Sequence, residues 1–302
     1  MNKISLNQEH FHNEEKARRY LEKIRWSDGI PVCPHCGSKN EHYELKAKKS
    51  SSELRGGVWK CKDCRNQFTV TVGTIFEGSH IPLDKWLFAV QILCSSKKGM
   101  SAKQIERMMG ITYKTAWFMM HRIRYAMEQN TQLPKLMGIV EVDETYIGGK
   151  SKGKRGRGSI NKIPVVSLIE RKGKVRSFQT DRVTAKNLKE VIRENVDKNS
   201  TIMTDEFKSS HGLKKEFQDH QVVNHGQKEY VNGIANTNTV EGYFSLLKRG
   251  IIGAYHHISK QHLKRYLAEF DFRYNNREIN DFEIGNFALN NIAGKRLMYK
   301  DS

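Results

Sequence analysis

The chain has 302 residues, 37% of them hydrophobic, and a formal charge of +19 from 52 Lys and Arg against 33 Asp and Glu. This length corresponds to about two domains, and the absence of any apolar run near ~18 residues or of a secretory signal predicts a cytoplasmic protein without a membrane partner. The basic excess indicates a polyanionic partner, with nucleic acid the commonest, although a ribosomal or membrane-surface protein would share it.

Residues 13–25 predict a short amphipathic helix, and a cysteine-containing segment follows it. The cysteines form two CxxC pairs, Cys33 with Cys36 and Cys61 with Cys64. Each CxxC is a tight turn that directs two thiolates at one point, so that two such turns complete a closed tetrahedral Zn²⁺ site. A unit this small needs the metal to fold. We therefore predict a structural zinc ribbon within residues 1–80, with unconnected cysteines in a reduced core as the alternative.

Residues 81–134 predict a helical DNA-binding segment of the helix-turn-helix type. Ser101 and Gln104 form a capping box that begins one helix. Gly110 ends this helix, and Thr112 is placed to cap the next. The second helix carries three cations beside an apolar face, namely Lys114, Arg122 and Arg124. This pattern is typical of a recognition helix in a major groove, and an ordinary helical hairpin with a solvated basic face is the alternative.

The second half of the chain alternates between strands and helices. A strand at residues 138–150 is followed by a basic, glycine-rich loop at 150–158 and by a hairpin that turns at Lys172–Gly173. A helix and a fourth strand come next, and then a polar loop from 206 to 238. The C-terminal third is mostly helical, and the helix at 262–275 has an apolar stripe that we expect to pack on the domain that contains these strands, with a role in oligomerisation as the alternative.

Three acidic residues, Asp143, Asp205 and Glu241, lie where this topology can bring them together. Asp143 is on the first strand, Asp205 ends the fourth, and Glu241 is in a helix. Phosphodiester cleavage needs an activated oxygen nucleophile and a stabilised leaving oxygen, which two Mg²⁺ ions about 3.5–4 Å apart provide. Because Mg²⁺ prefers carboxylate oxygens, we predict that Asp143 bridges two ions and that the other two residues each hold one.

Each of these residues also has a structural interpretation. Asp143 or Asp205 alone can be a loop or cap residue, and Glu241 can be the capping-box partner of Asn238. Lys248 lies seven residues after Glu241, two helical turns, and therefore shares its face. There Lys248, together with the adjacent Arg249, is predicted to contact the phosphate backbone.

These motifs resemble the zinc-ribbon DDE transposases of bacterial insertion sequences, of the ISXO type, over nearly the whole chain. The likeness is carried by CPHCG, CKDC and VEVDETYIGG, and most specifically by the string that begins NTVEGYFSLLKRG. It implies an α/β fold, in which an RNase H-like mixed-sheet catalytic domain at residues 135–302 follows the zinc ribbon and the helix-turn-helix-like segment. It also implies Mg²⁺ or Mn²⁺ as cofactor, and cleavage at the ends of a mobile element with transfer of the 3′ ends into target DNA.

The resemblance makes Asp143, Asp205 and Glu241 the metal-binding triad and makes Lys248 a DNA contact. Some relatives use Asn as the third member, so Asn238 is the alternative, but a carboxylate binds Mg²⁺ better than an amide does. The expected partner is double-stranded DNA of the element ends and the target, bound by at least a dimer at the nucleoid. The remaining hypotheses are a DNA-binding regulator with an inactive acidic trio and a nuclease without strand transfer.

Overall fold

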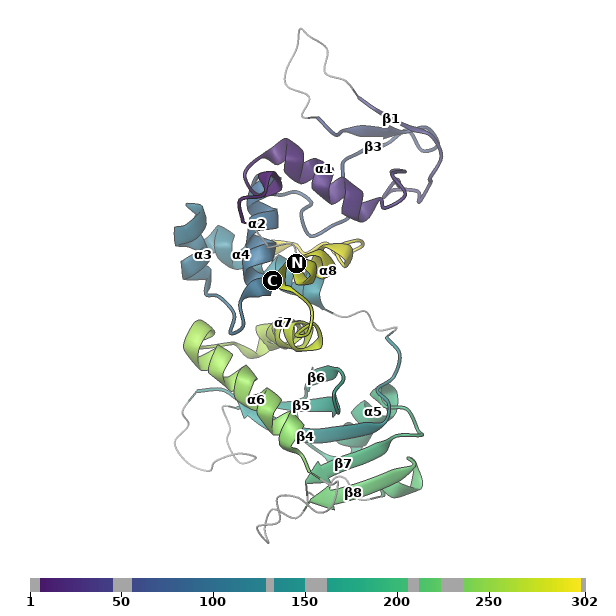
Figure 1. Ribbon diagram of the computed structural model, residues 1–302, viewed down its shortest axis with the longest axis vertical. Coiled ribbons are helices and arrows are strands. Elements are labelled where there is room, and N and C mark those ends of the chain that lie inside the picture. The colour runs from purple at the N-terminus through teal and green to yellow at the C-terminus, as the bar shows by residue number, and fades with distance from the viewer. Residues whose placement is uncertain are drawn as a thin grey trace. The chain divides into compact units, whose positions relative to one another are not determined.

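The computed structural model describes residues 6–45, 56–128, 133–149, 162–205, 212–223 and 236–299 (Figure 1). The basic loop predicted at 150–158 lies outside these residues. The chain divides into two compact units: Met1–Met127 with Glu278–Ser302, called here the ribbon unit, and Glu128–Arg277, called the sheet unit. This division differs from the predicted one, because the residues after 277 belong with the N-terminal part of the chain.

The ribbon unit begins with α1 (Glu14–Arg25), the helix predicted at 13–25. Asn13 caps it by accepting a hydrogen bond of 3.0 Å from the amide of Lys16. An antiparallel sheet follows, in the order β1 (His42–Glu44), β2 (Trp59–Cys61) and β3 (Gln67–Phe68). These short strands carry the cysteine turns and confirm the predicted ribbon.

Helices form the rest of the ribbon unit: α2 (Leu83–Ser95), α3 (Ala102–Met109), α4 (Tyr113–Met127) and α8 (Asp281–Asn290). The predicted boundaries of α3 are confirmed, since the Ser101 hydroxyl accepts from the Gln104 amide and Gly110 adopts a left-handed conformation with φ 63°. Helix α8 packs against α2, where the Gln91 side-chain amide donates to the Asp281 carbonyl at 2.8 Å. Within the described residues, no helix has the length and apolar character that a membrane span requires.

The sheet unit contains a five-stranded mixed sheet in the order β6-β5-β4-β7-β8. Its strands are β4 (Ile139–Ile147), β5 (Ile163–Glu170), β6 (Val175–Gln179), β7 (Thr201–Asp205) and β8 (Asp219–Val223). The pairings β4–β5 and β5–β6 are antiparallel, whereas β4–β7 and β7–β8 are parallel. This is the predicted RNase H-like fold. The interpretation of residues 206–238 as continuous loop was wrong at β8, a short strand whose mostly half-exposed side chains lack an apolar alternation.

Helices cover both faces of this sheet. Val166 and Leu168 of β5 pack with α5 (Ala185–Asn195) on one face. Val165 and Ile169 of the same strand pack on the other face with α6 (Asn238–Gly250) and α7 (Leu263–Asn275). Figure 1 shows α6 lying across β4 and β5, and the apolar stripe of α7 belongs to the same core cluster, as predicted. The sheet therefore has an α5 face and an α6 face.

Candidate active site

Asp143 points to the α6 face of the sheet. Val140 and Val142 of β4 belong to the cluster on α5, whereas Ile147 belongs to the cluster on α6. Side chains alternate between the two faces along a strand. Glu141 and Asp143, which have the same parity as Ile147, therefore face α6.

Asp205 is the last residue of β7, the strand parallel to β4. Val142 pairs in register with Thr204, so the next step along both strands places Asp143 beside Asp205. Because neighbouring residues in register lie on the same face of the sheet, the two carboxylates share the α6 face. The predicted positions, one on the first strand and one at the end of the fourth, are confirmed.

Glu241 lies in the first turn of α6 and is exposed. The residue that caps this helix is Thr237, whose hydroxyl donates to Glu241 Oε1 at 3.1 Å. Asn238 is already inside the helix, so the capping-box interpretation of Glu241 with Asn238 is wrong. The hydrogen bond from Thr237 orients the Glu241 carboxylate.

The three carboxylates interact electrostatically. The pKa of Asp143 is raised to about 7, chiefly by burial and in smaller part by the negative charges of Glu144, Asp205 and Glu241. The hydrogen bond from the Glu144 amide at 2.7 Å opposes this increase. A cation relieves such repulsion, so the half-buried Asp143 and Asp205 and the exposed Glu241 together have the charge and the donor atoms of a site for hard divalent cations.

Asp143, Asp205 and Glu241 are not drawn together as closely as the ribbon cysteines. In the part of the chain that the structure describes, only the ribbon cysteines bring ligand atoms from three or more residues within 4.8 Å of one another. The ligand atoms of Asp143, Asp205 and Glu241 therefore do not all lie within that distance of one another.

The cysteine cluster has the dimensions of a tetrahedral zinc site. The Sγ atoms of Cys33 and Cys64 are 3.7 Å apart, as are those of Cys36 and Cys61. A tetrahedron with metal–sulfur distances of about 2.3 Å has edges of about 3.8 Å. Gly37 completes the first turn with φ 75° and donates from its amide to the Cys33 carbonyl at 2.9 Å. The predicted four-cysteine site is therefore present in the fold.

Glu141 is a residue of the site that the sequence analysis missed. Its side chain is completely buried, and it accepts hydrogen bonds from the amides of Thr239 and Val240 at 2.9 and 3.1 Å. The Thr239 hydroxyl and Arg171 Nε also donate to it, at 2.9 and 2.7 Å. Its signal in the sequence was an acidic residue at an inward-facing strand position, two residues before Asp143.

The predicted basic face of α4 was wrong for two of its three cations. Arg122 and Arg124 are only 5% and 1% exposed. Every residue from 119 to 124 is buried, so this part of the helix has no solvated face. Arg122 lies near the Trp86 ring and donates to the Glu77 carbonyl. Lys114, at the beginning of the helix, is exposed as predicted.

The basic residues of α6 are accessible. Lys248 and Arg249 are both exposed, on the same side of the helix as Glu241. The opposite side is buried and packs on the sheet through Phe244 and Leu247. As predicted, α6 presents the acidic residue and the cations together.

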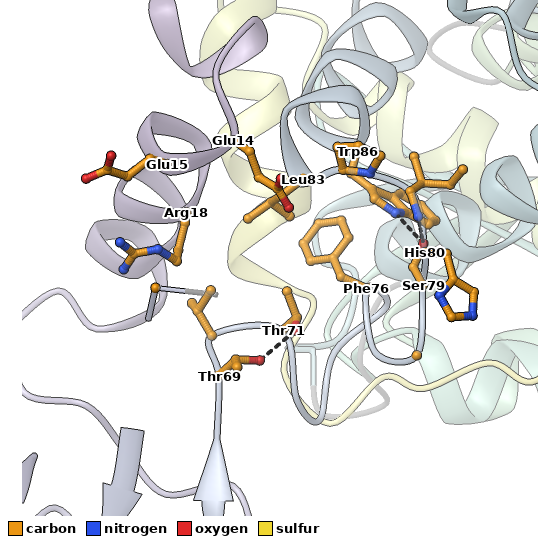
Figure 2. Close-up of a pocket in the computed structure, with 15 residues that line it drawn as sticks. Glu14, Glu15, Arg18, Thr69, Thr71, Phe76, Ser79, His80, Leu83 and Trp86 are labelled. Atoms are coloured by element: carbon orange, nitrogen blue, oxygen red, sulfur yellow. Dashed lines mark hydrogen bonds between the residues drawn. The ribbon is translucent and has the colours of Figure 1, made fainter. Parts of the chain in front are cut away.

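A separate hollow of about 630 Å³ lies in the ribbon unit, between α1, the start of α2 and the segment that joins β3 to α2 (Figure 2). Trp86 lines it and donates from its indole nitrogen to the Ser79 hydroxyl at 2.9 Å. Glu14 and Glu15 lie in the same wall as Arg18. Because these acidic groups offset the arginine, the hollow is not a cationic pocket for phosphate.

Known protein families match both parts of the chain. The sequence model of the ISXO2-like transposase domain matches residues 135–275, and that of the transposase zinc-ribbon domain matches residues 12–67. An uncharacterized protein in transposable element ISH50 of Halobacterium salinarum is 30% identical over 287 residues, which cover 87% of this chain and 91% of that protein. An uncharacterized transposase-like protein of Haemophilus influenzae is 32% identical over 113 residues, 36% of this chain and 86% of its own. The ranges matched by the two family models span the four ribbon cysteines and all three acidic residues.

Proposed function

We propose, because this chain belongs to the ISXO2-like transposase family, that it binds the ends of an insertion sequence and catalyses metal-dependent strand cleavage and strand transfer. The observation that supports this most is the clustering of Asp143, Asp205 and Glu241 on the α6 face of an RNase H-like sheet. Each comes from a different element, so the fold itself brings the three carboxylates together.

Asp143, Asp205 and Glu241 would hold two divalent cations. Such a pair, about 3.5–4 Å apart, would activate the attacking oxygen and stabilise the leaving oxygen. Asp143 suits the shared position because it lies beside Asp205 in the sheet and also interacts electrostatically with Glu241.

Exposed cations would hold the DNA next to these carboxylates. Lys248 and Arg249 follow Glu241 along the exposed side of α6, where they would neutralise backbone phosphates. In the ribbon unit, the zinc ribbon and Lys114 would contribute further contacts. Because two element ends must be joined to one target, we propose that at least a dimer acts on the DNA.

A strand-transfer assay tests the proposal. Wild type and Asp143→Asn are incubated with Mg²⁺, the DNA ends that flank the gene in its genome, and a supercoiled target plasmid. Joined products from wild type alone are expected, because the variant keeps its shape but loses the bridging charge. Binding without cleavage or joining, in Mg²⁺ and in Mn²⁺, would instead favour the regulator. Hydrolysis without joining would favour the nuclease.

A further inference from the structure

We infer that the buried Glu141–Arg171 pair fixes the position of Glu241 relative to Asp143 and Asp205, and thereby sets the affinity of the carboxylate site for divalent cations. The inference rests on the proposed function, in which those three residues hold the metal. It concerns two residues that contact the backbone and side chains around the site rather than the metal itself.

Glu141 takes the place of a side-chain cap for α6. The first amides of a helix have no partner within the helix and are usually satisfied by a cap residue. Thr237 occupies the cap position, but its side chain makes no capping hydrogen bond to these amides. Glu141 accepts from two of them, those of Thr239 and Val240. A negative charge is also favourable at this end of the helix dipole, so β4 holds α6 at the turn that contains Glu241.

Arg171 extends this connection to all three segments that bear the carboxylates. Its Nε donates to Glu141 of β4, and its Nη2 donates to the Asn236 carbonyl just before α6 at 3.0 Å. The same nitrogen is 3.1 Å from the Met203 Sδ atom of β7, two residues before Asp205. The guanidinium also balances the charge of a carboxylate that has no exposure to water. One side chain thus contacts β4, β7 and the segment leading into α6.

Thr237 connects the start of α6 to Glu241, the proposed metal ligand. Its carbonyl accepts from the Glu241 amide at 3.1 Å, and its hydroxyl donates to the Glu241 carboxylate. A rotation of the first turn of α6 would therefore move Glu241 away from Asp143. Displacements of about 1 Å in a reacting site can cost about a hundredfold in rate, and loss of an outer contact to a ligand typically costs about 10- to 100-fold in metal affinity.

The test measures metal binding directly, by the electron paramagnetic resonance signal of free Mn²⁺ titrated with the full-length, zinc-loaded protein. Glu141→Gln is compared with wild type and with Glu269→Gln. Glu269 is a matched control, because it is also completely buried and paired with an arginine, Arg273 at 2.5 Å, but both lie within α7. We expect Glu141→Gln to raise the Kd for Mn²⁺ about 10- to 100-fold. Glu269→Gln should lower the melting temperature without changing that Kd.

Equal Mn²⁺ affinity in Glu141→Gln and wild type would overturn the inference, whatever happens to stability. If circular dichroism shows that Glu141→Gln does not fold, Arg171→Lys replaces it. This variant keeps the charge but loses the planar fork that reaches Asn236 and Met203, so its Kd should rise by about tenfold. An unchanged Kd in that variant likewise overturns the inference.

The assay also separates the inference from the proposed function. Asp143→Asn should bind Mn²⁺ more weakly than wild type if the carboxylates form the metal site. If Asp143→Asn binds as tightly as wild type, the metal site itself is refuted. If Asp143→Asn is weaker while Glu141→Gln is not, only the role of the Glu141–Arg171 pair is refuted.

Discussion

Helices α4 and α6 each carry two closely spaced cations, yet the structure buries one pair and exposes the other. Arg122 and Arg124 of α4 are enclosed, whereas Lys248 and Arg249 of α6 are accessible beside Glu241. Both arginines are buried because every residue from 119 to 124 is enclosed, and the spacing adds a reason why they cannot form one exposed basic face. Residues two apart lie about 200° apart around a helix, so Arg122 and Arg124 cannot share one face. Residues 248 and 249 are only about 100° apart and fit within one exposed stripe.

The two pairs therefore have different physical roles. Arg122 donates to the Glu77 carbonyl and lies near aromatic rings, and burial lowers the pKa of its guanidinium. It therefore contributes to the packing of the ribbon unit. Lys248 and Arg249 remain hydrated and available to phosphates. The net charge of +19 consequently overstates how many cations can contact DNA.

The largest effect on strand transfer is expected at Glu241, the acidic residue in the first turn of α6. Glu241→Gln should reduce strand transfer by at least about a thousandfold, about 4 kcal/mol in barrier, because an amide is a poor Mg²⁺ ligand. Asn238→Ala, at the neighbouring exposed position, should retain activity within about tenfold. Quantified joined product in the plasmid assay measures both. The opposite ranking would make Asn238 the third ligand.

Because Arg122 and Arg124 of α4 are buried, the zinc ribbon is the main remaining candidate for DNA contacts in the ribbon unit. Removal of zinc tests this candidate. Exposed cations such as Lys62 and Arg65 lie next to the second cysteine turn. Since the short strands depend on the metal to fold, chelation should weaken binding to the element ends by at least about tenfold. Fluorescence anisotropy with labelled ends measures this, and added Zn²⁺ should restore binding. Unchanged affinity after verified zinc loss would show that the ribbon does not contact DNA.

A matched pair of substitutions tests the two helices directly. Arg122→Met should lower the free energy of unfolding by about 1–3 kcal/mol, because the Glu77 carbonyl loses its donor. Lys248→Met should change it by no more than about 0.5 kcal/mol, because the side chain is exposed. Denaturant titrations give both values. If Arg122→Met instead weakens DNA binding without loss of stability, Arg122 must become exposed and contact DNA in the complex.

The sequence was most informative where local chemistry decides the structure. The cysteine turns, the cap at Ser101, the left-handed Gly110 and the hairpin at Lys172–Gly173 follow from residue types at fixed spacing, and the structure contains each. Asp143 and Asp205 were predictable because alternating apolar residues identify the strand of the first and an apolar run identifies the strand of the second.

Features that depend on long-range contacts were not predictable in the same way. β8 exists because it pairs with β7, not because its own residues alternate. Glu141 lies 98 residues from Thr239, to which it is hydrogen-bonded. The burial of Arg122 depends on a carbonyl 45 residues earlier. In each case the deciding partner is distant in the chain, where local patterns carry no information.

The smallest expected effect is on the salt dependence of DNA binding, which reports how many phosphates the exposed cations of α6 contact. Each Lys or Arg that neutralises a phosphate contributes about 0.9 to the slope of log K against log salt. Lys248→Met should therefore reduce the slope for binding the element ends by about 1. Arg249→Met should reduce it less, because Arg249 Nε also donates to the Ser245 carbonyl at 3.1 Å. Arg122→Met should leave the slope unchanged. Anisotropy titrations at several salt concentrations provide these slopes, and an equal reduction in all three variants would mean that burial does not determine which cations contact the DNA.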